Sequence, residues 1–273
     1  MNKLKEIFKK EKGVVIGAIH FPPLLGYQDF PGFDTAIKNT LEDLQSFESG
    51  GVDGVIVENN YDTPHKVEVG PEIVASMTYL TEKIKSVAKV PIGISVLWND
   101  YKTALSIAKV LKLQFIRLPV FVDIVKTNYG TVEGNPEEVL VFRKHIGAED
   151  VAIFTDIHVK HSQIISKHSV IESVNLAIEQ GADALIVTGN WTGDAPNIDE
   201  LKKIREKIQN FPILCGSGVN AENIKTLFKY ANGAIVSTSL KEGKVDSKEI
   251  NIKPYSHRID RQKVEILLAK VRQ

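Results

Sequence analysis

The chain has 273 residues, and its 34 basic and 34 acidic side chains give a formal net charge of zero. Without a basic patch or a block of like charge, a nucleic acid is not an expected partner. A single cysteine, Cys215, excludes an intrachain disulfide framework and fits a reducing compartment. No apolar run is long enough to cross a bilayer, so we expect a cytoplasmic protein with no transmembrane segment.

The first segment, 1–12, is rich in lysine and places Leu4, Ile7 and Phe8 at helical spacing. Three apolar residues form a small anchor, so we expect a short helix that caps one end of the fold. A basic amphipathic turn on a membrane surface is the alternative.

From residue 14 onward, apolar strand-like runs alternate with helix-like segments. The predicted strands are 14–20, 52–58, 92–98, 115–118, 151–158, 184–188, 213–216 and 234–238. The predicted helices are 34–49, 72–88, 101–112, one opened by Asn135 and Pro136, and then 169–180, 197–208, 221–230 and 260–271. Strands that are apolar on both faces are typical of a parallel sheet covered by helices.

Eight such units predict an α/β fold, a (β/α)₈ TIM barrel that takes up residues 1–273 as a single domain. A doubly wound open sheet is the alternative, and it usually carries a glycine-rich fingerprint after the first strand. Here the first strand is followed by Phe21, Pro22 and Pro23. This segment favours the barrel.

Two connections are long. Segment 122–134 contains Gly130 and Gly134 and is predicted to be an irregular lid that excludes water from a site. Segment 241–258 is a long loop before the last helix, and it could cover the barrel mouth, contact a neighbouring subunit or remain a plain surface loop. If this loop contacts a neighbouring subunit, the protein is a homo-oligomer.

The glycine-rich turns occur late in the chain. Gly216, Ser217 and Gly218 follow the seventh strand, and Ser237 and Thr238 follow the eighth. In barrels of this kind these two loops are the usual phosphate site, because glycine allows close backbone approach and helix N-termini attract anions. The alternative is that Gly216 and Gly218 serve only a tight strand-to-helix turn.

Polar residues end several other strands, as expected where catalytic groups converge on a barrel rim. Glu58 and Asp156 are candidates for acid–base chemistry, and His158 shares a strand face with Asp156 and is a natural proton shuttle. Arg117 either pairs with one of these carboxylates or binds an anionic substrate. Lys160 is the nearest candidate for an imine-forming amine, a reaction that the pattern allows but does not favour.

The sequence does not identify a cofactor. A divalent metal held by Glu58, Asp156 and His158, with His20 as a further ligand, is one hypothesis, although the spacing is not diagnostic. Asn59, His20 and Gly189 complete the predicted substrate-binding set, together with the late glycine and hydroxyl residues.

Several blocks of the chain resemble the BtpA/SgcQ family. They are residues 17–26, 51–64 and 156–161, and Thr188-Gly189 with Thr192-Gly193, so the resemblance extends to about Leu240. It implies a barrel of the ribulose-phosphate-binding type in a family of poorly defined chemistry, whose type member is named for photosystem I biogenesis. His65 replaces a hydrophobic residue of the family pattern.

Two functional hypotheses follow. The first is an isomerase, lyase or hydrolase acting on a small phosphorylated ligand, a sugar phosphate or a nucleotide-like compound, by acid–base or metal-assisted chemistry. The second is a non-catalytic assembly or regulatory factor of the photosystem I biogenesis type, which uses the barrel for recognition.

Overall fold

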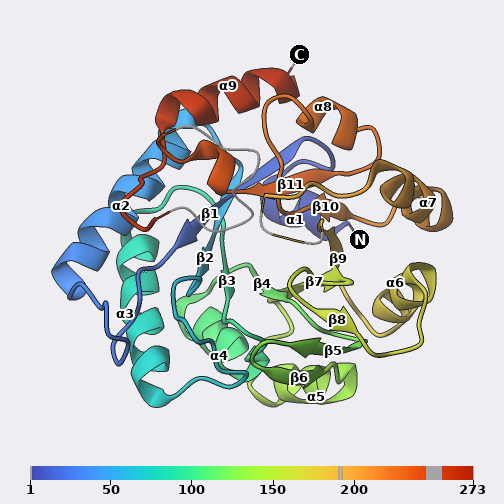
Figure 1. Cartoon of the computed structure of the whole chain (residues 1–273), viewed down its shortest axis with the longest axis horizontal. Coiled ribbons are helices and arrows are strands. Elements are labelled where there is room, and N and C mark those ends of the chain that lie inside the picture. Colours follow the sequence, from blue (N-terminus) through green and yellow to red (C-terminus); the bar gives the residue numbers. More distant parts are fainter. Residues whose placement is uncertain (1, 190, 192, 244–253, 273) are drawn as a thin grey trace.

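The computed structural model describes residues 2–189, 191, 193–243 and 254–272. Eight parallel strands in this part of the chain close into a barrel, which confirms the predicted TIM-barrel class (Figure 1). In their order around the barrel they are β1 (Val14–His20), β2 (Gly54–Glu58), β3 (Ile92–Ser95), β4 (Phe115–Leu118), β7 (Ala152–Ile157), β9 (Ala184–Val187), β10 (Ile213–Cys215) and β11 (Gly233–Val236). Every predicted barrel strand is present, with ends that differ by at most three residues.

Helices surround the barrel, and local capping explains several of their boundaries. Asp100 and Asn135 each accept a hydrogen bond from a backbone N–H of the following first turn, and Ser169 forms a capping box with Glu172. The helices are α2 (Phe33–Gly50), α3 (Pro71–Val87), α4 (Tyr101–Leu111), α5 (Pro136–His145), α6 (Val170–Glu179), α7 (Ile198–Ile208), α8 (Ile224–Leu227) and α9 (Arg261–Arg272). None of the described helices is both long enough and apolar enough to span a membrane.

The helix predicted over 221–230 is wrong in its length, because α8 has only four residues. Asn220 accepts hydrogen bonds from the N–H groups of Glu222 and Asn223 through its side chain, and Asn223 accepts one from the N–H of Asn220. These side-chain bonds hold residues 220–223 in a turn ahead of α8.

The first helix, α1 (Lys3–Phe8), lies at the N-terminal end of the barrel. Leu4 and Phe8 are buried in the same apolar cluster as the barrel interior. The ring of Phe8 meets the edge of Phe115 at 5.8 Å, and Phe115 stacks on Phe154 at 4.6 Å. A Cβ on Gly54 would lie 2.6 Å from the Phe8 ring, so the glycine allows this close packing.

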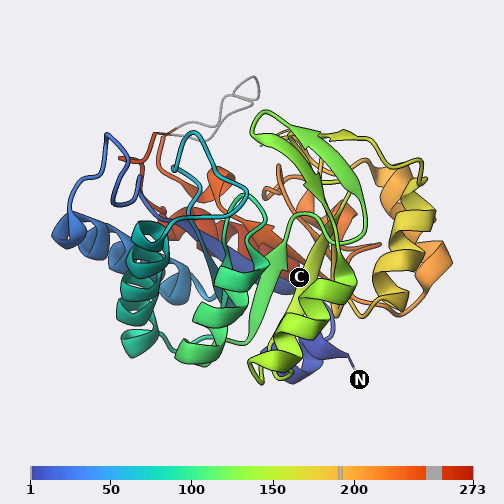
Figure 2. The ribbon, with the colours of Figure 1, turned by 90° about the horizontal axis from the view of Figure 1, so that it is seen from below.

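The segment predicted to be an irregular lid is instead an ordered hairpin. Strand β5 (Ile124–Thr127) pairs with β6 (Gly130–Glu133) on one side and with β8 (Gln163–Ile164) on the other, in a separate antiparallel sheet. Val125 and Val132 anchor this sheet on a small apolar cluster with Trp98. The hairpin stands above the barrel at the end away from the N-terminus (Figure 2).

The long loop before the last helix is described only in part, because residues 244–253 lie outside the described residues. At its ends, Lys241 pairs with Ile259 in an isolated antiparallel bridge. The Lys241 side chain is buried and donates a hydrogen bond to the Tyr61 hydroxyl at 2.8 Å. The start of the loop is therefore fixed against the C-terminal end of the barrel.

Candidate active site

The site residues continue a pattern set by the barrel interior. Side chains two residues apart on a strand share a face, so the residue two positions beyond an interior apolar residue also points inward, one layer higher. Five interior apolar residues are followed in this way by five polar ones: Ala18 by His20, Ile56 by Glu58, Phe115 by Arg117, Phe154 by Asp156 and Ile235 by Ser237. The C-terminal layer of the barrel is therefore polar where the layer beneath it is apolar.

Arg117 is the centre of a buried ion cluster. Its Nε and Nη2 donate to the two carboxylate oxygens of Asp156, both at 2.8 Å, and its Nη1 donates to Oε1 of Glu58 at 2.9 Å. All three residues are less than a tenth exposed. Burial opposes the charge of Arg117, but the two carboxylates outweigh it and raise its pKa. Arg117 is thus a fixed cation paired with both carboxylates.

Asp156 lies behind this arginine. Both of its oxygens are bonded to Arg117, its side chain is fully buried, and it is absent from the residues that line the described cavities. The structure therefore places this predicted proton carrier outside the described cavities, bonded to Arg117. Asp156 orients Arg117, which in turn reaches the cavity.

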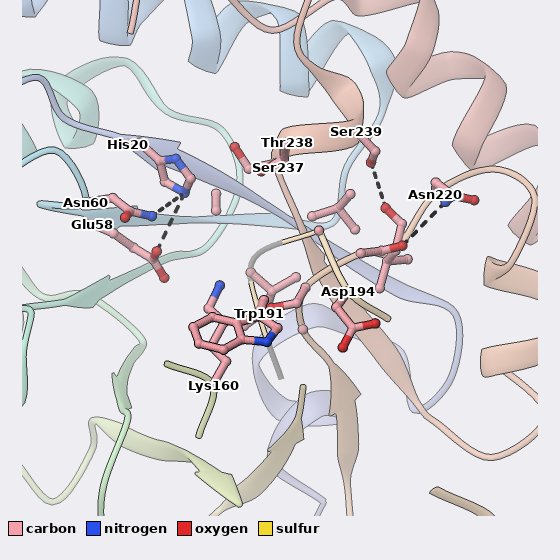
Figure 3. Close-up of a pocket in the computed structure, with 18 of the residues that line it drawn as sticks. His20, Glu58, Asn60, Lys160, Trp191, Asp194, Asn220, Ser237, Thr238 and Ser239 are labelled. Atoms are coloured by element: carbon pink, nitrogen blue, oxygen red, sulfur yellow. Dashed lines mark hydrogen bonds and ion pairs between the residues drawn. The ribbon is translucent and has the colours of Figure 1, made fainter. Parts of the chain in front are cut away.

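A cavity of about 320 Å³ opens beside this cluster. One wall carries ionisable side chains and the other carries the turns after β10 and β11. His20, Glu58 and Asn60 lie on one side and Ser237, Thr238 and Ser239 on the other, with the Lys160 amine pointing into the space between them (Figure 3). The cavity brings together these predicted site residues: His20, Glu58, Arg117, Lys160, Gly216, Ser217, Gly218, Ser237 and Thr238.

Two hydroxyl groups at this cavity have no hydrogen-bond partner among the described residues. They are Ser217 Oγ and Ser237 Oγ, and both atoms are buried. Ser217 adopts a left-handed backbone conformation with φ of 62°, which places its side chain in the turn after β10. Buried polar atoms are normally satisfied, so two unsatisfied hydroxyls at one cavity indicate a place for a polar ligand.

His20 is held in its neutral form. Burial lowers its pKa well below the ordinary value, and the charges of Lys241, Lys160 and Arg117 lower it further. Its Nε2 lies 3.3 Å from the Asn60 amide nitrogen and 3.6 Å from Glu58 Oε2. Burial and the three nearby cations therefore both favour the neutral imidazole.

Lys160 follows strand β7 and reaches the cavity from below the Trp191 ring in the view of Figure 3. Burial lowers its pKa to about 8, the charge of Arg117 acts in the same direction, and Glu58 and Asp156 act against it. An amine with this pKa exchanges protons close to neutral pH.

His158 is separated from the cavity. Strand β7 ends at Ile157, and His158 has a φ of 49°, so the alternation that predicted a shared face with Asp156 stops one residue too early. The His158 ring lies 3.3 Å from the Ser173 hydroxyl, which donates to Asp123. The structure therefore does not bring His158 together with the cavity residues, because its ring lies beside Ser173 of α6 and lines neither cavity.

Two further predicted ligands have structural roles. Asn59 is buried, bonds Asp62 through its amide nitrogen at 3.0 Å and accepts from the Leu97 N–H at 2.7 Å. A Cβ on Gly189 would lie 2.3 Å from the Asp194 carbonyl oxygen. Neither residue lines a described cavity, so the structure moves both from the ligand to the support of loops.

The glycines after β10 have a similar explanation. Gly218 has a φ of 54°, and a Cβ there would lie 2.4 Å from the Ala195 nitrogen. Gly216 would place a Cβ 3.0 Å from Thr188 Cγ2. Close packing of this turn against the loop after β9 therefore requires Gly218.

A metal site does not form from the predicted ligands. Within the described ranges, no three His, Cys, Asp or Glu side chains are arranged to hold a metal ion. The carboxylates of Glu58 and Asp156 are bonded to Arg117, and His158 lies elsewhere. The fold therefore separates His158 from the other predicted metal ligands, Glu58 and Asp156.

Two residues at or near the cavity, Trp191 and Lys241, were not predicted from the sequence. Trp191 lines the cavity although its ring is 51% exposed, and Lys241 influences His20 from the start of a loop. Neither residue stands at a strand end, and no local pattern marks it. Asp194 and Asn220 also line the cavity from the turns after β9 and β10.

Comparison with known sequences places the chain in a family. Residues 10–269 match the BtpA family. The chain belongs to the BtpA family. One relative is the photosystem I biogenesis protein BtpA of Synechocystis, which is 37% identical over 230 residues, or 83% of this chain and 80% of the relative.

Solved structures agree with the fold. N-(5'-phosphoribosyl)anthranilate isomerase from Pyrococcus furiosus has a TM-score of 0.58 and 15% identity, covering 95% of this chain and 98% of that chain. (S)-3-O-geranylgeranylglyceryl phosphate synthase from Thermoplasma acidophilum has a TM-score of 0.60 and 12% identity, covering 98% and 96%. At these identities the likeness concerns the barrel architecture alone.

Proposed function

We propose that this BtpA-family protein is an enzyme that binds a phosphorylated small molecule and moves a proton within it. One observation carries the proposal: Glu58, Lys160 and His20 face the same cavity as two buried, unsatisfied hydroxyls. Polar groups of this kind at the C-terminal end of a barrel are typical of active sites.

The phosphate would bind at the turns after β10 and β11. Ser217 and Ser237 would donate hydrogen bonds from their hydroxyls to phosphate oxygens. Lys160, Lys241 and Arg117 supply positive charge near this position, and after burial these three cations are the causes that lower the pKa of His20. A phosphate monoester is the small-molecule group that uses both the donors and the charge.

Glu58 and Lys160 would then act as base and acid. The carboxylate of Glu58, held by Arg117, would remove a proton from carbon next to a carbonyl group. Lys160, protonated at neutral pH because its pKa is about 8, would donate a proton to the developing oxyanion, and the fixed charge of Arg117 would stabilise that oxyanion. Isomerisation and carbon–carbon bond lysis both begin with this step.

Binding is tested by calorimetric titration with inorganic phosphate and ribose 5-phosphate. Ser217→Gly removes the hydroxyl and suits the positive φ, and Ser237→Ala removes the other. Each variant should weaken binding about tenfold, because a hydrogen bond to a charged group contributes about 1.5–3 kcal/mol. The matched control is Ser86→Ala on the exposed face of α3, which should leave the Kd unchanged.

Proton transfer is tested by NMR in D₂O with phosphorylated aldoses and ketoses. We expect deuterium to enter the carbon next to the carbonyl in at least one compound that binds, and Glu58→Gln to slow this exchange at least about 100-fold. The proposal fails if no phosphorylated compound binds, or if Glu58→Gln leaves the exchange rate unchanged in folded protein.

The second candidate is an assembly factor, which the identity to the Synechocystis BtpA protein supports. On this hypothesis the barrel recognises a partner protein and the cavity has no reaction to perform. Capture of a membrane-protein partner that survives both Glu58→Gln and Ser237→Ala would favour it. Loss of capture in both variants would instead link recognition to the cavity.

A further inference from the structure

A second cavity of about 480 Å³ adjoins the first at the C-terminal end of the barrel. The two cavities share five lining residues, Glu58, Asn60, Arg117, Lys160 and Trp191. The proposed reacting groups therefore stand at the junction, with the unsatisfied hydroxyls on one side. A ligand that fills both cavities would have its phosphate at one end and a different group at the other.

Six of the fifteen residues that line the second cavity carry an aromatic or imidazole ring. His65 and Tyr129 meet edge to face at 5.1 Å, and His161 and Trp191 do so at 5.4 Å. The rings come from the loops after several barrel strands and from the turn of the β5–β6 hairpin: Tyr61, His65, Trp98, Tyr129, His161 and Trp191. Aromatic faces of this kind stack well on a planar ring.

The polar groups among these rings are neutral. Burial lowers the pKa of His65 to about 4, with a contribution from His161, and burial lowers that of His161 to about 4, with a contribution from Lys160. A neutral imidazole offers one donor and one acceptor nitrogen. His65 Nδ1 is buried and has no hydrogen-bond partner in the described part of the chain.

These features separate three kinds of occupant. A second phosphate would meet cations only at the junction, where Lys160 and Arg117 also line the first cavity, and neutral rings elsewhere. An alkyl chain would leave the buried His65 nitrogen unsatisfied, which is costly. A planar heterocycle stacks on the rings and offers donors and acceptors at its edge, which the unsatisfied Nδ1 of His65 can use.

We propose that the second cavity binds the heterocycle of a phosphorylated ligand, so that the substrate is a nucleotide-like compound, a phosphorylated sugar that carries a planar heterocycle, and not a plain sugar phosphate. This inference rests on the proposed function, because it uses the same phosphate position. The sugar would then lie at the junction, beside Glu58 and Lys160. The carbonyl group that the proposed proton transfer requires would belong to this sugar in its open-chain form, and nucleoside monophosphates, whose sugar ring is closed and has no carbonyl group, serve as probes of binding.

The test is calorimetric titration of the whole chain with AMP, GMP, CMP and UMP, compared with ribose 5-phosphate and octyl phosphate. At least one nucleotide should bind about tenfold or more tightly than ribose 5-phosphate. An increase of this size is expected when one base stacks on aromatic side chains. Tyr129→Ala and His65→Leu should each reduce this preference and leave the Kd for ribose 5-phosphate within about twofold. Tyr79→Ala, on an exposed ring of α3, is the matched control and should preserve the preference.

The outcomes separate the two proposals. Three outcomes would overturn the heterocycle site and leave the phosphate site in place. Ribose 5-phosphate could bind as tightly as every nucleotide, or octyl phosphate could bind more tightly than the nucleotides. The third outcome is a nucleotide preference that survives both Tyr129→Ala and His65→Leu. Absence of binding by inorganic phosphate, ribose 5-phosphate and all four nucleotides would overturn both. Thermal unfolding of each variant establishes that it is folded.

Discussion

The two ends of the barrel are built by the same strands and have opposite chemistry. At the N-terminal end, Leu4 and Phe8 of α1 pack against the interior rings of Phe115 and Phe154. Two residues further along those same strands, Arg117 and Asp156 form a buried ion pair. Packing alone stabilises the buried side chains at the apolar end, whereas each buried charge at the polar end needs a partner of opposite charge.

This difference separates stability from function along the barrel axis. Apolar burial at the closed end stabilises the fold and needs no ligand. At the open end, charges are buried next to cavities and two hydroxyls lack partners. Changes at the closed end should therefore alter stability without altering binding, and changes at the open end should alter binding and affect stability in either direction.

The largest stability effect is expected at the ion cluster. Asp156→Ala leaves the buried guanidinium of Arg117 with only Glu58 as a partner, so the free energy of unfolding should fall by about 3–5 kcal/mol. Urea unfolding followed by circular dichroism measures this change. Phosphate binding should weaken as well, because Arg117 loses the carboxylate that orients it.

A triple variant provides the control for this cluster. Glu58→Leu, Arg117→Met and Asp156→Leu together remove every charge of the cluster and should recover most of the lost stability, since apolar replacements of a whole buried ion cluster are often neutral. Binding should remain lost. A triple variant as unstable as Asp156→Ala would show that the cluster stabilises the barrel in its own right.

Phe8→Ala tests the closed end. The side chain is 6% exposed and fills the space above Gly54, so its removal should cost about 3 kcal/mol. The Kd for ribose 5-phosphate should stay within about twofold of the wild-type value. Ile7→Ala, which removes a partly buried neighbour on the same helix, should cost less. A change of binding in folded Phe8→Ala would mean that the two ends are coupled.

The same contrast explains what sequence could predict. The barrel follows from local signals, because apolar runs and helix caps such as Asn135 and Ser169 act within a few residues. Alternation along a strand also places Glu58, Arg117 and Ser237 in one layer once the strands are aligned. The fold and several cavity residues could therefore be expected before any coordinates.

Other features depend on geometry that periodicity does not contain. His158 left the predicted face because β7 ends at Ile157 and the next residue turns with positive φ. Asp156 became a partner of Arg117 because both of its oxygens meet one guanidinium across neighbouring strands. The hairpin β5–β6 has strands of only four residues, too short for their alternation to stand out from a loop.

The smallest expected effect is a gain in stability at the open end. Burial lowers the pKa of Lys160 to about 8, whereas an unfolded lysine keeps a pKa near 10.4. Below pH 8 both states carry the charged lysine, and the charge costs more free energy in the buried site than in the unfolded chain. This cost lowers the free energy of unfolding by its full amount in that pH range. Between pH 8 and about 10 the unfolded state binds the additional proton, so the penalty declines as the pH rises.

Lys160→Met should accordingly raise the Tm at pH 7 by about 3 °C, and the advantage should shrink steadily between pH 8 and pH 10. Thermal unfolding at pH 7, 8, 9 and 10 measures it, with Lys85→Met on the exposed face of α3 as the control for loss of a surface charge. A variant that is less stable than the wild type at pH 7, or a difference that is independent of pH, would contradict the burial of a cation at this position. The expected combination of higher stability and lost proton transfer is what distinguishes a functional lysine from a structural one, because a structural ion pair would lose stability when its cation is removed.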